Sequence, residues 1–225
     1  MSRQALHAQP PGLRVLTDGH GPDVLLIAGP GDDASAWEPQ IAALAGAFRM
    51  TRYDARALDA ANALPGAFTQ ASLVEEALAV LDVAGIERAH VIGTSLGGVI
   101  AQMLAIYHPE RVVSITLCAT WARPDQALRA RYDSRPWATE HAGSTNALLE
   151  HDTRVLLASV PLPALIVAGA DDPLGASHSR QLAALLQHGR LELVAGAGRR
   201  PNEEQAATFN RLVEAFLVRA SSSAR

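Results

Sequence analysis

Four nearly continuous apolar runs, separated by segments with helical periodicity, constrain the fold of this chain most strongly. The runs cover residues 24–28, 90–93, 112–118 and 164–168. A strand that is apolar along its whole length is buried on both faces, which is typical of a parallel sheet with helices on each side. We therefore predict an α/β fold with a mostly parallel central sheet, in which a ligand binds beyond the carboxyl ends of the strands.

Weaker patterns predict the remaining elements. Further strands are expected at residues 13–17, 49–53 and 190–194, and helices at residues 38–47, 72–84, 96–108, 177–186 and 204–219. The segment 121–159 interrupts the alternation and is expected to form a short lid. The 225 residues contain no internal repeat or linker, so we expect one domain, 1–225, with a disordered tail from Ser221 to Arg225.

The stretch Val-Ile-Gly-Thr-Ser-Leu-Gly-Gly at residues 91–98 is an apolar strand that enters Gly-x-Ser-x-Gly and then a helical pattern. This arrangement places a serine nucleophile on a sharp strand-to-helix turn. The turn is sterically possible because Gly93 and Gly97 have no side chains that would collide with neighbouring backbone. Ser95 would lie at a helix N-terminus, where the N–H of Leu96 and the helix dipole stabilise an oxyanion. We interpret Ser95 as the candidate nucleophile. The alternative is a Gly-Ser loop that opens an ordinary helix.

Composition limits the kinds of molecule that this chain is expected to bind and the compartment in which it is expected to occur. The net charge of −4 is not accompanied by a Lys/Arg cluster, which argues against nucleic acid and membrane surfaces. The expected partner is therefore a small molecule, and no motif requires a metal or an organic cofactor. The single cysteine, Cys118, lies in an apolar run and is expected to be buried and structural. Residues 1–9 lack the apolar stretch of a secretory signal, which favours a cytoplasmic location.

Five stretches give the chain a resemblance to the α/β-hydrolase superfamily. They are residues 25–31 with Trp37, residues 53–56, the Ser95 turn with residues 108–112, residues 166–173 and residues 195–205. Within the superfamily the chain looks most like 3-oxoadipate enol-lactonases, haloperoxidase-like esterases and meta-cleavage-product hydrolases. The resemblance implies an α/β-hydrolase fold and a triad acid in a Gly-x-x-Asp pattern. That acid falls on Asp172, with Asp171 the less favoured choice.

The chain departs from this family at two positions that matter for catalysis. The family's histidine falls on Arg199, and a guanidinium stays protonated near neutral pH, so it cannot act as an ordinary general base. The oxyanion loop reads Ala28-Gly29-Pro30-Gly31, where Pro30 has no N–H to donate. In an alignment shifted by one residue, Gly29 would donate instead. A routine Ser-His-Asp relay is therefore not expected.

Three histidines are candidates to replace the missing base. His178 follows Asp172 closely and is the best placed, while His141 and His151 lie in the expected lid. The histidines at the far ends of their elements, His90, His108 and His188, are expected to be structural.

The ligand is expected to contact Arg199, Pro30 and Trp121. Arg199 either forms an ion pair with Asp172 or holds a substrate carboxylate or enolate. These observations predict an enzyme with a defective triad that acts on a small apolar carbonyl compound. It would be a slow ester or lactone hydrolase, or a catalyst of elimination, cyclisation or isomerisation. The alternative is a non-catalytic pseudohydrolase that binds a small ligand or a partner protein.

Overall fold

A computed structural model of the chain describes residues 13–29, 31–54, 69–133 and 149–223. Within these residues seven strands form one sheet, in which β1 is antiparallel to β3 and all other neighbours are parallel. Their order across the sheet is β1 (Val15–Asp18), β3 (Arg49–Tyr53), β2 (Asp23–Ile27), β4 (Ala89–Thr94), β5 (Val112–Cys118), β6 (Ala164–Gly169) and β7 (Gly189–Val194). The predicted α/β fold with a mostly parallel sheet is confirmed.

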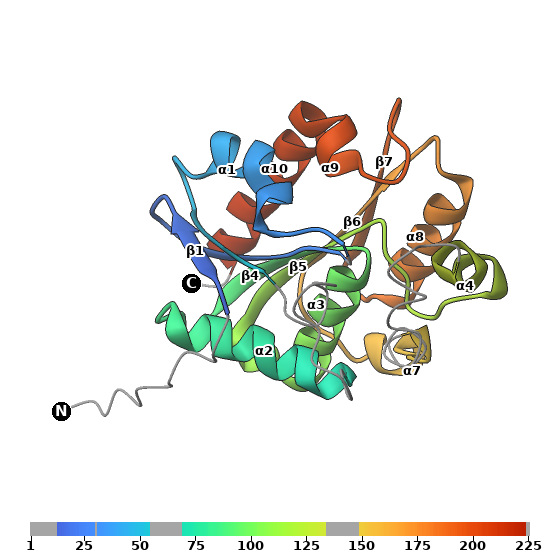
Figure 1. The fold of residues 1–225 in the computed structure, drawn as a ribbon, viewed down its shortest axis with the longest axis horizontal. Helices are drawn as coiled ribbons and strands as arrows, with labels where there is room; N and C mark the ends of the chain where they lie inside the picture. The colour runs from blue at the N-terminus through green and yellow to red at the C-terminus, as the bar shows by residue number, and fades with distance from the viewer. Residues whose placement is uncertain (1–12, 30, 55–68, 134–148, 224–225) are drawn as a thin grey trace.

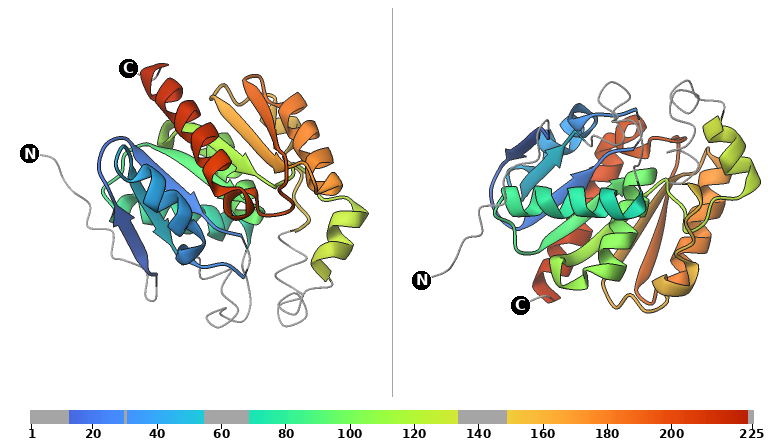
Figure 2. Two further views of the ribbon diagram at one scale, coloured as in Figure 1. Left: turned by 90° about the horizontal axis from the view of Figure 1, so that it is seen from above. Right: turned by 60° about the horizontal axis from the view of Figure 1, so that its bottom comes forward.

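Helices cover both faces of the sheet (Figure 1). One face carries α2 (Gln70–Val83), α3 (Leu96–Tyr107), α7 (Arg154–Leu157) and α8 (Pro173–Leu185), and the other carries α1 (Glu38–Leu44), α9 (Pro201–Glu204) and α10 (Ala206–Ser223). In Figure 2 the left view looks onto α1 and α10, and the right view onto α2 and α3. The helix α4 (Gln126–Asp133) and two short turns, η1 (Ala34–Trp37) and η2 (Pro109–Arg111), complete the described elements.

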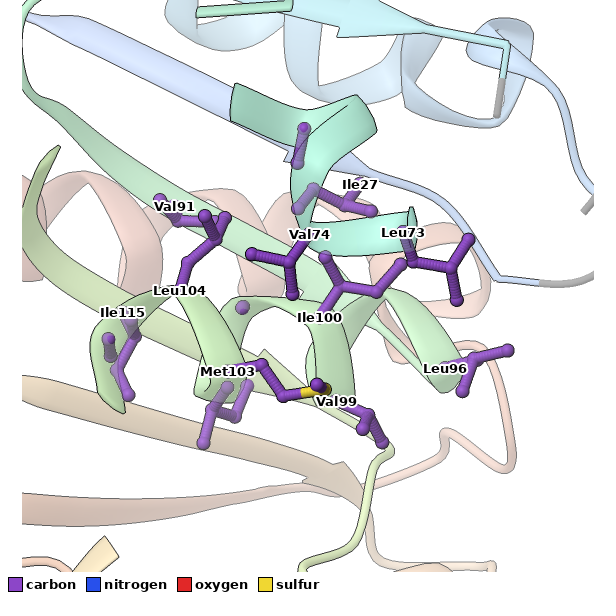
Figure 3. Close-up of a cluster of buried hydrophobic side chains, with 14 of the residues drawn as sticks. Ile27, Leu73, Val74, Val91, Leu96, Val99, Ile100, Met103, Leu104 and Ile115 are labelled. Carbon is purple, nitrogen blue, oxygen red and sulfur yellow. The ribbon is translucent and has the colours of Figure 1, made fainter. Parts of the chain in front are cut away.

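The apolar strands divide their side chains between two cores, as the period of two requires. Leu25 and Val91 face the α2 and α3 side, whereas Leu26 and Ile92 face the α1 and α10 side. Figure 3 shows α3 side chains packed between the sheet and α2. Cys118 is fully buried, as expected, and this burial raises the pKa of its thiol to about 12. Among the described helices, none combines the length and the apolarity needed to traverse a bilayer.

Several predicted boundaries of helices and strands are wrong. Helix α8 begins at Pro173 instead of residue 177, because proline suits the first helical turn and Asp172 precedes it as the N-cap. The helix predicted at residues 204–219 is divided into α9 and α10 at Gln205. Helix α10 then continues to Ser223, so the tail predicted to be disordered from Ser221 is helical for three of its residues.

A buried histidine attaches the end of α10 to the sheet. His90 is 2% exposed, with Nδ1 lying 2.7 Å from Oγ of Ser114 and Nε2 lying 2.9 Å from Oγ of Ser221. Burial lowers the pKa of His90 to about 4, and the positive charge of Arg88 acts in the same direction. The structural role predicted for His90 agrees with this position at the start of β4, distant from the carboxyl end of the strand.

Acidification from about pH 7 to about pH 5 is expected to cost about 2 kcal/mol of unfolding free energy through His90. The unfolded chain takes up the proton near pH 6.5 and the folded chain only near 4, so stability is lost as the pH falls between these values. Urea denaturation at both pH values should show a smaller pH effect in His90→Gln. His20→Gln, which alters an exposed histidine, is the matched control. An unchanged pH effect in His90→Gln would contradict this assignment.

Candidate active site

The turn between β4 and α3 holds Ser95 in a left-handed backbone conformation, with φ 54° and ψ −121°. Glycine is required on both sides because a Cβ at Gly93 would lie 2.2 Å from the carbonyl oxygen of Gly97. A Cβ at Gly97 would lie 2.2 Å from the carbonyl oxygen of Ile27. The strand, sharp turn and helix expected from the sequence are therefore present. Such a turn presents the serine hydroxyl at the end of the sheet.

A cavity of about 400 Å³ lies where the strands end. It is lined by residues that follow successive strands: Gly29 after β2, Ser95 after β4, Thr120 after β5, Asp172 after β6 and Arg199 after β7. This placement agrees with the prediction that the ligand site lies beyond the carboxyl ends of the strands.

The oxyanion loop lies directly beside the serine. A Cβ built on Gly29 would be 3.0 Å from Cβ of Ser95 and 3.6 Å from its Oγ. Leu96 is the first residue of α3, so its N–H belongs to the first helical turn. Pro30 lies outside the described residues. The assignment of Leu96 and Gly29 as oxyanion donors stays a prediction, as does a ligand contact by Pro30.

Asp172 is paired with an arginine that the sequence did not suggest. Its side chain is 8% exposed, and Arg131 of α4 binds it through two hydrogen bonds, Nη1 to Oδ2 at 2.8 Å and Nη2 to Oδ1 at 2.9 Å. The hydrogen bonds from Arg131 hold the pKa of Asp172 below its ordinary value, although burial opposes this shift. The ion pair considered between Arg199 and Asp172 is a wrong expectation, because Arg131 occupies the carboxylate.

The hydroxyl of Ser95 forms a hydrogen bond with the phenol of Tyr132, the residue after Arg131. Tyr132 is 6% exposed, and its ring packs edge-on against Trp121 with a centroid separation of 5.3 Å. Trp121 lines the cavity, and the expected contact between Trp121 and a ligand stays a prediction. Sequence reasoning missed Arg131 and Tyr132 because α4 lies in the expected lid, where no motif gave either residue a role.

The candidate histidines do not bond to Ser95 in the described part of the chain. His178 is buried on α8 and lines the cavity, but its Nε2 lies 3.3 Å from Oδ2 of Asp125, without the alignment of a hydrogen bond. His151 is buried with its ring centroid 6.1 Å from that of Trp121. His141 lies outside the described residues. A catalytic role for His178 therefore remains a prediction.

Arg199 is an exposed cation that lines the cavity. Its loop is held by Glu204, whose carboxylate accepts hydrogen bonds from the N–H groups of Gly198 and Arg200. The guanidinium of Arg200 is neutralised by Asp32 and by Glu203, each at 2.6 Å. Among the described residues, Arg199 has no acidic partner within ion-pair distance. The cavity therefore holds one cation whose charge is not balanced by a neighbouring carboxylate.

Acidic, histidine and cysteine side chains do not form a group suited to a metal ion anywhere in the described residues. Polar groups of the cavity are instead engaged with one another: Ser95 bonds to Tyr132, Asp172 bonds to Arg131, and Arg200 is paired with Asp32 and Glu203. Such an arrangement has the parts for nucleophilic attack and for recognition of an anion.

Comparisons with known proteins match this chain to hydrolases. A family model described as alpha/beta hydrolase fold matches residues 22–158. RutD of Variovorax paradoxus, named as a carbamate hydrolase, is 28% identical over 90% of this chain and 96% of its own length. A crystal structure of a hydrolase from Pseudomonas aeruginosa is 30% identical, with a TM-score of 0.80 over 91% of this chain and 94% of that one. The enol-lactonase from Burkholderia xenovorans is 26% identical, with a TM-score of 0.79 over 92% and 96% of the two chains.

Proposed function

The chain belongs to the α/β-hydrolase fold family, and from that premise we propose that it hydrolyses a compact ester, lactone or carbamate that carries an anionic group. In this proposal Ser95 attacks the carbonyl carbon, and the N–H groups of Leu96 and Gly29 stabilise the oxyanion. Arg199 binds the anionic group of the substrate. The names of the similar proteins, a carbamate hydrolase and an enol-lactonase, support an acyl substrate.

One observation carries the proposal. Ser95 has a left-handed backbone conformation at the start of α3, and it lines a cavity that also contains Asp172. A non-glycine residue in this conformation costs free energy, so folded proteins keep it mainly where it serves function. A serine held in this way beside a ligand-sized cavity supports a nucleophilic role.

The charge distribution supports the alternative in which Arg199 holds an anionic group of the small apolar carbonyl compound expected from the sequence. Arg131 and Arg200 each lie against carboxylates, whereas Arg199 has none in the described residues. A guanidinium presents several donors in a plane that matches a carboxylate. A cavity of about 400 Å³ suits a small ligand.

A second candidate function is a non-catalytic ligand-binding protein. It is favoured by the finding that, in the described residues, no imidazole is hydrogen-bonded to Ser95. Incubation with a fluorophosphonate and with p-nitrophenyl acetate separates the candidates. Covalent labelling together with release of nitrophenol supports the hydrolase. An unlabelled protein that binds small carboxylic esters without turnover supports the ligand-binding candidate.

Arg199→Gln is expected to raise the KM for an anionic ester about tenfold, because a hydrogen bond to a charged group contributes about 1.5–3 kcal/mol. The measurement compares mono-p-nitrophenyl succinate with p-nitrophenyl acetate, whose KM should change less than about twofold. Arg211→Gln, on the exposed side of α10, is the matched control. An equal change for both esters would show that Arg199 does not select for the charge.

A further inference from the structure

We infer that Tyr132 is the catalytic proton-transfer residue of this site and that Arg131 and Asp172 position it. This inference rests on the proposed hydrolase function and assigns the proton transfer from Ser95, for which the sequence suggests His178 or the histidines of the expected lid. Tyr132 belongs to α4, in the segment between β5 and β6. Neither the motifs of the sequence nor the comparisons give it a role.

Tyr132 is in contact with the proposed nucleophile. Within the described residues, the phenol of Tyr132 is the hydrogen-bond partner of the Ser95 hydroxyl. A phenolate can accept a proton and the phenol that results can donate it, so the same side chain can serve as base in one step and as acid in the next. The rival groups are less suited: His178 lies against Asp125, and the guanidinium of Arg199 stays protonated.

Packing holds the phenol of Tyr132 in place. The ring of Tyr132 is buried and packs edge-on against Trp121, which is 2% exposed. Leu128, one helical turn earlier on α4, is also buried, at 5% exposure. A proton-transfer group works best when packing fixes its side chain at bonding distance from the reacting atom.

The residue before Tyr132 is anchored to the edge of the cavity. Arg131 binds Asp172 through two hydrogen bonds, which attaches α4 to the start of α8 at the edge of the cavity. Because Tyr132 follows Arg131 directly, this attachment sets where the phenol lies. The guanidinium is also close enough to interact with a charge on Tyr132. A nearby cation stabilises a phenolate more than a phenol. Arg131 and Asp172 are therefore positioning residues.

The surroundings of the phenol contain both signs of charge. The charged or titratable groups that line the same cavity are Asp32, Arg131, Asp172, His178, Arg199, Arg200, Glu203 and Glu204. Asp125, on the loop before α4, is also close enough to interact with Arg131. Of the cations among them, Arg131 is the one adjacent in sequence to Tyr132.

The proposed steps balance in atoms and electrons. The Tyr132 phenolate takes the proton of the Ser95 hydroxyl while Oγ bonds to the acyl carbon and the carbonyl π pair moves to oxygen. Collapse of the adduct re-forms the carbonyl and expels the leaving group, which takes the proton from the phenol. Water then gives a proton to the phenolate and attacks the acyl carbon, and Ser95 departs with that proton.

Tyr132→Phe is expected to slow labelling of Ser95 by a fluorophosphonate by about a hundredfold or more, because general base catalysis contributes about 10²–10⁴-fold. Phenylalanine keeps the ring that packs on Trp121, so Tm should stay within a few degrees. Tyr107→Phe, which alters an exposed tyrosine at the end of α3, is the matched control.

A second measurement detects the acid step, which a merely structural role would not affect. Nitrophenolate departs without a proton, whereas an alkoxide needs one. Tyr132→Phe should therefore lose more kcat with an alkyl ester than with the matching p-nitrophenyl ester. For Arg131, the lysine variant should label faster than Arg131→Gln, because lysine keeps the cation beside Asp172 and Tyr132.

Each result either supports or overturns the inference. Labelling of Tyr132→Phe at the wild-type rate overturns it while the proposed hydrolase stands. Faster labelling overturns it as well, since Tyr132 would then block Ser95. Loss of labelling in His178→Gln together with unchanged labelling in Tyr132→Phe would overturn it and identify His178 as the proton-transfer residue. Wild-type protein that neither labels nor hydrolyses any ester removes the proposed function and this inference together.

Discussion

Ser95→Ala is expected to eliminate fluorophosphonate labelling and to reduce ester hydrolysis about a thousandfold or more, to the background rate. Removing the nucleophile of a serine protease costs about a millionfold in kcat, and a slower enzyme can lose only the part above background. The hydroxyl lines the cavity beside Gly29 and Tyr132, and alanine removes the attacking oxygen and little else. Intact-protein mass spectrometry measures the label, and initial rates measure hydrolysis.

The controls for this experiment test folding and specificity. Ser222→Ala, which removes an exposed serine hydroxyl on α10, should label and hydrolyse like the wild-type protein. Ser95→Ala should keep its Tm within a few degrees, because alanine replaces a residue of similar size. Hydrolysis that persists in Ser95→Ala at the wild-type rate would show that a different group performs the chemistry.

Gly97→Ala is expected to destabilise the protein by about 3 kcal/mol or more, the range of severe overpacking. The new Cβ would lie 2.2 Å from the carbonyl oxygen of Ile27 and 2.6 Å from that of Ala28. Both contacts are with backbone, which cannot rotate away as a side chain can. Relief requires α3 to move away from β2, and this movement would separate Ser95 from Gly29.

Urea denaturation compares Gly97→Ala with the matched variant Gly46→Ala. A Cβ at Gly46 has no heavy atom within 4 Å outside its chain neighbours, so that variant should stay within about 0.5 kcal/mol of the wild-type protein. Gly97→Ala should also lose labelling of Ser95. A variant with the wild-type denaturation midpoint and labelling rate would contradict the tight turn described for this site.

Much of the fold could be predicted because its signals are local. The apolar runs at β2, β5 and β6 are strands that expose neither face to water, so composition alone distinguishes them. The glycine spacing around Ser95 likewise reports a turn whose steric demands fall on adjacent residues. The predicted start of α8 is too late because Pro173 and Gly175 are poor helix formers. Proline is nevertheless tolerated in the first turn, where its missing N–H costs no hydrogen bond.

Only part of the candidate site could be predicted from the sequence. Ser95 and Asp172 each follow a strand and could be placed at one edge of the sheet. Their partners could not be found in this way. Arg199, which aligns with the family's histidine, is exposed. The residue that binds Asp172 is instead Arg131 of α4.

The sequence by itself determined the strands, the serine turn and the edge of the sheet where the cavity lies, because those features depend on periodicity and on sterics between neighbouring residues. Only the tertiary structure decided that Tyr132 meets Ser95 and that Arg131 meets Asp172, across separations of 37 and 41 residues. Such contacts depend on where α4 packs against the cavity. That position follows from the burial of Leu128 and Tyr132 in a core built by distant segments, and no local pattern encodes it.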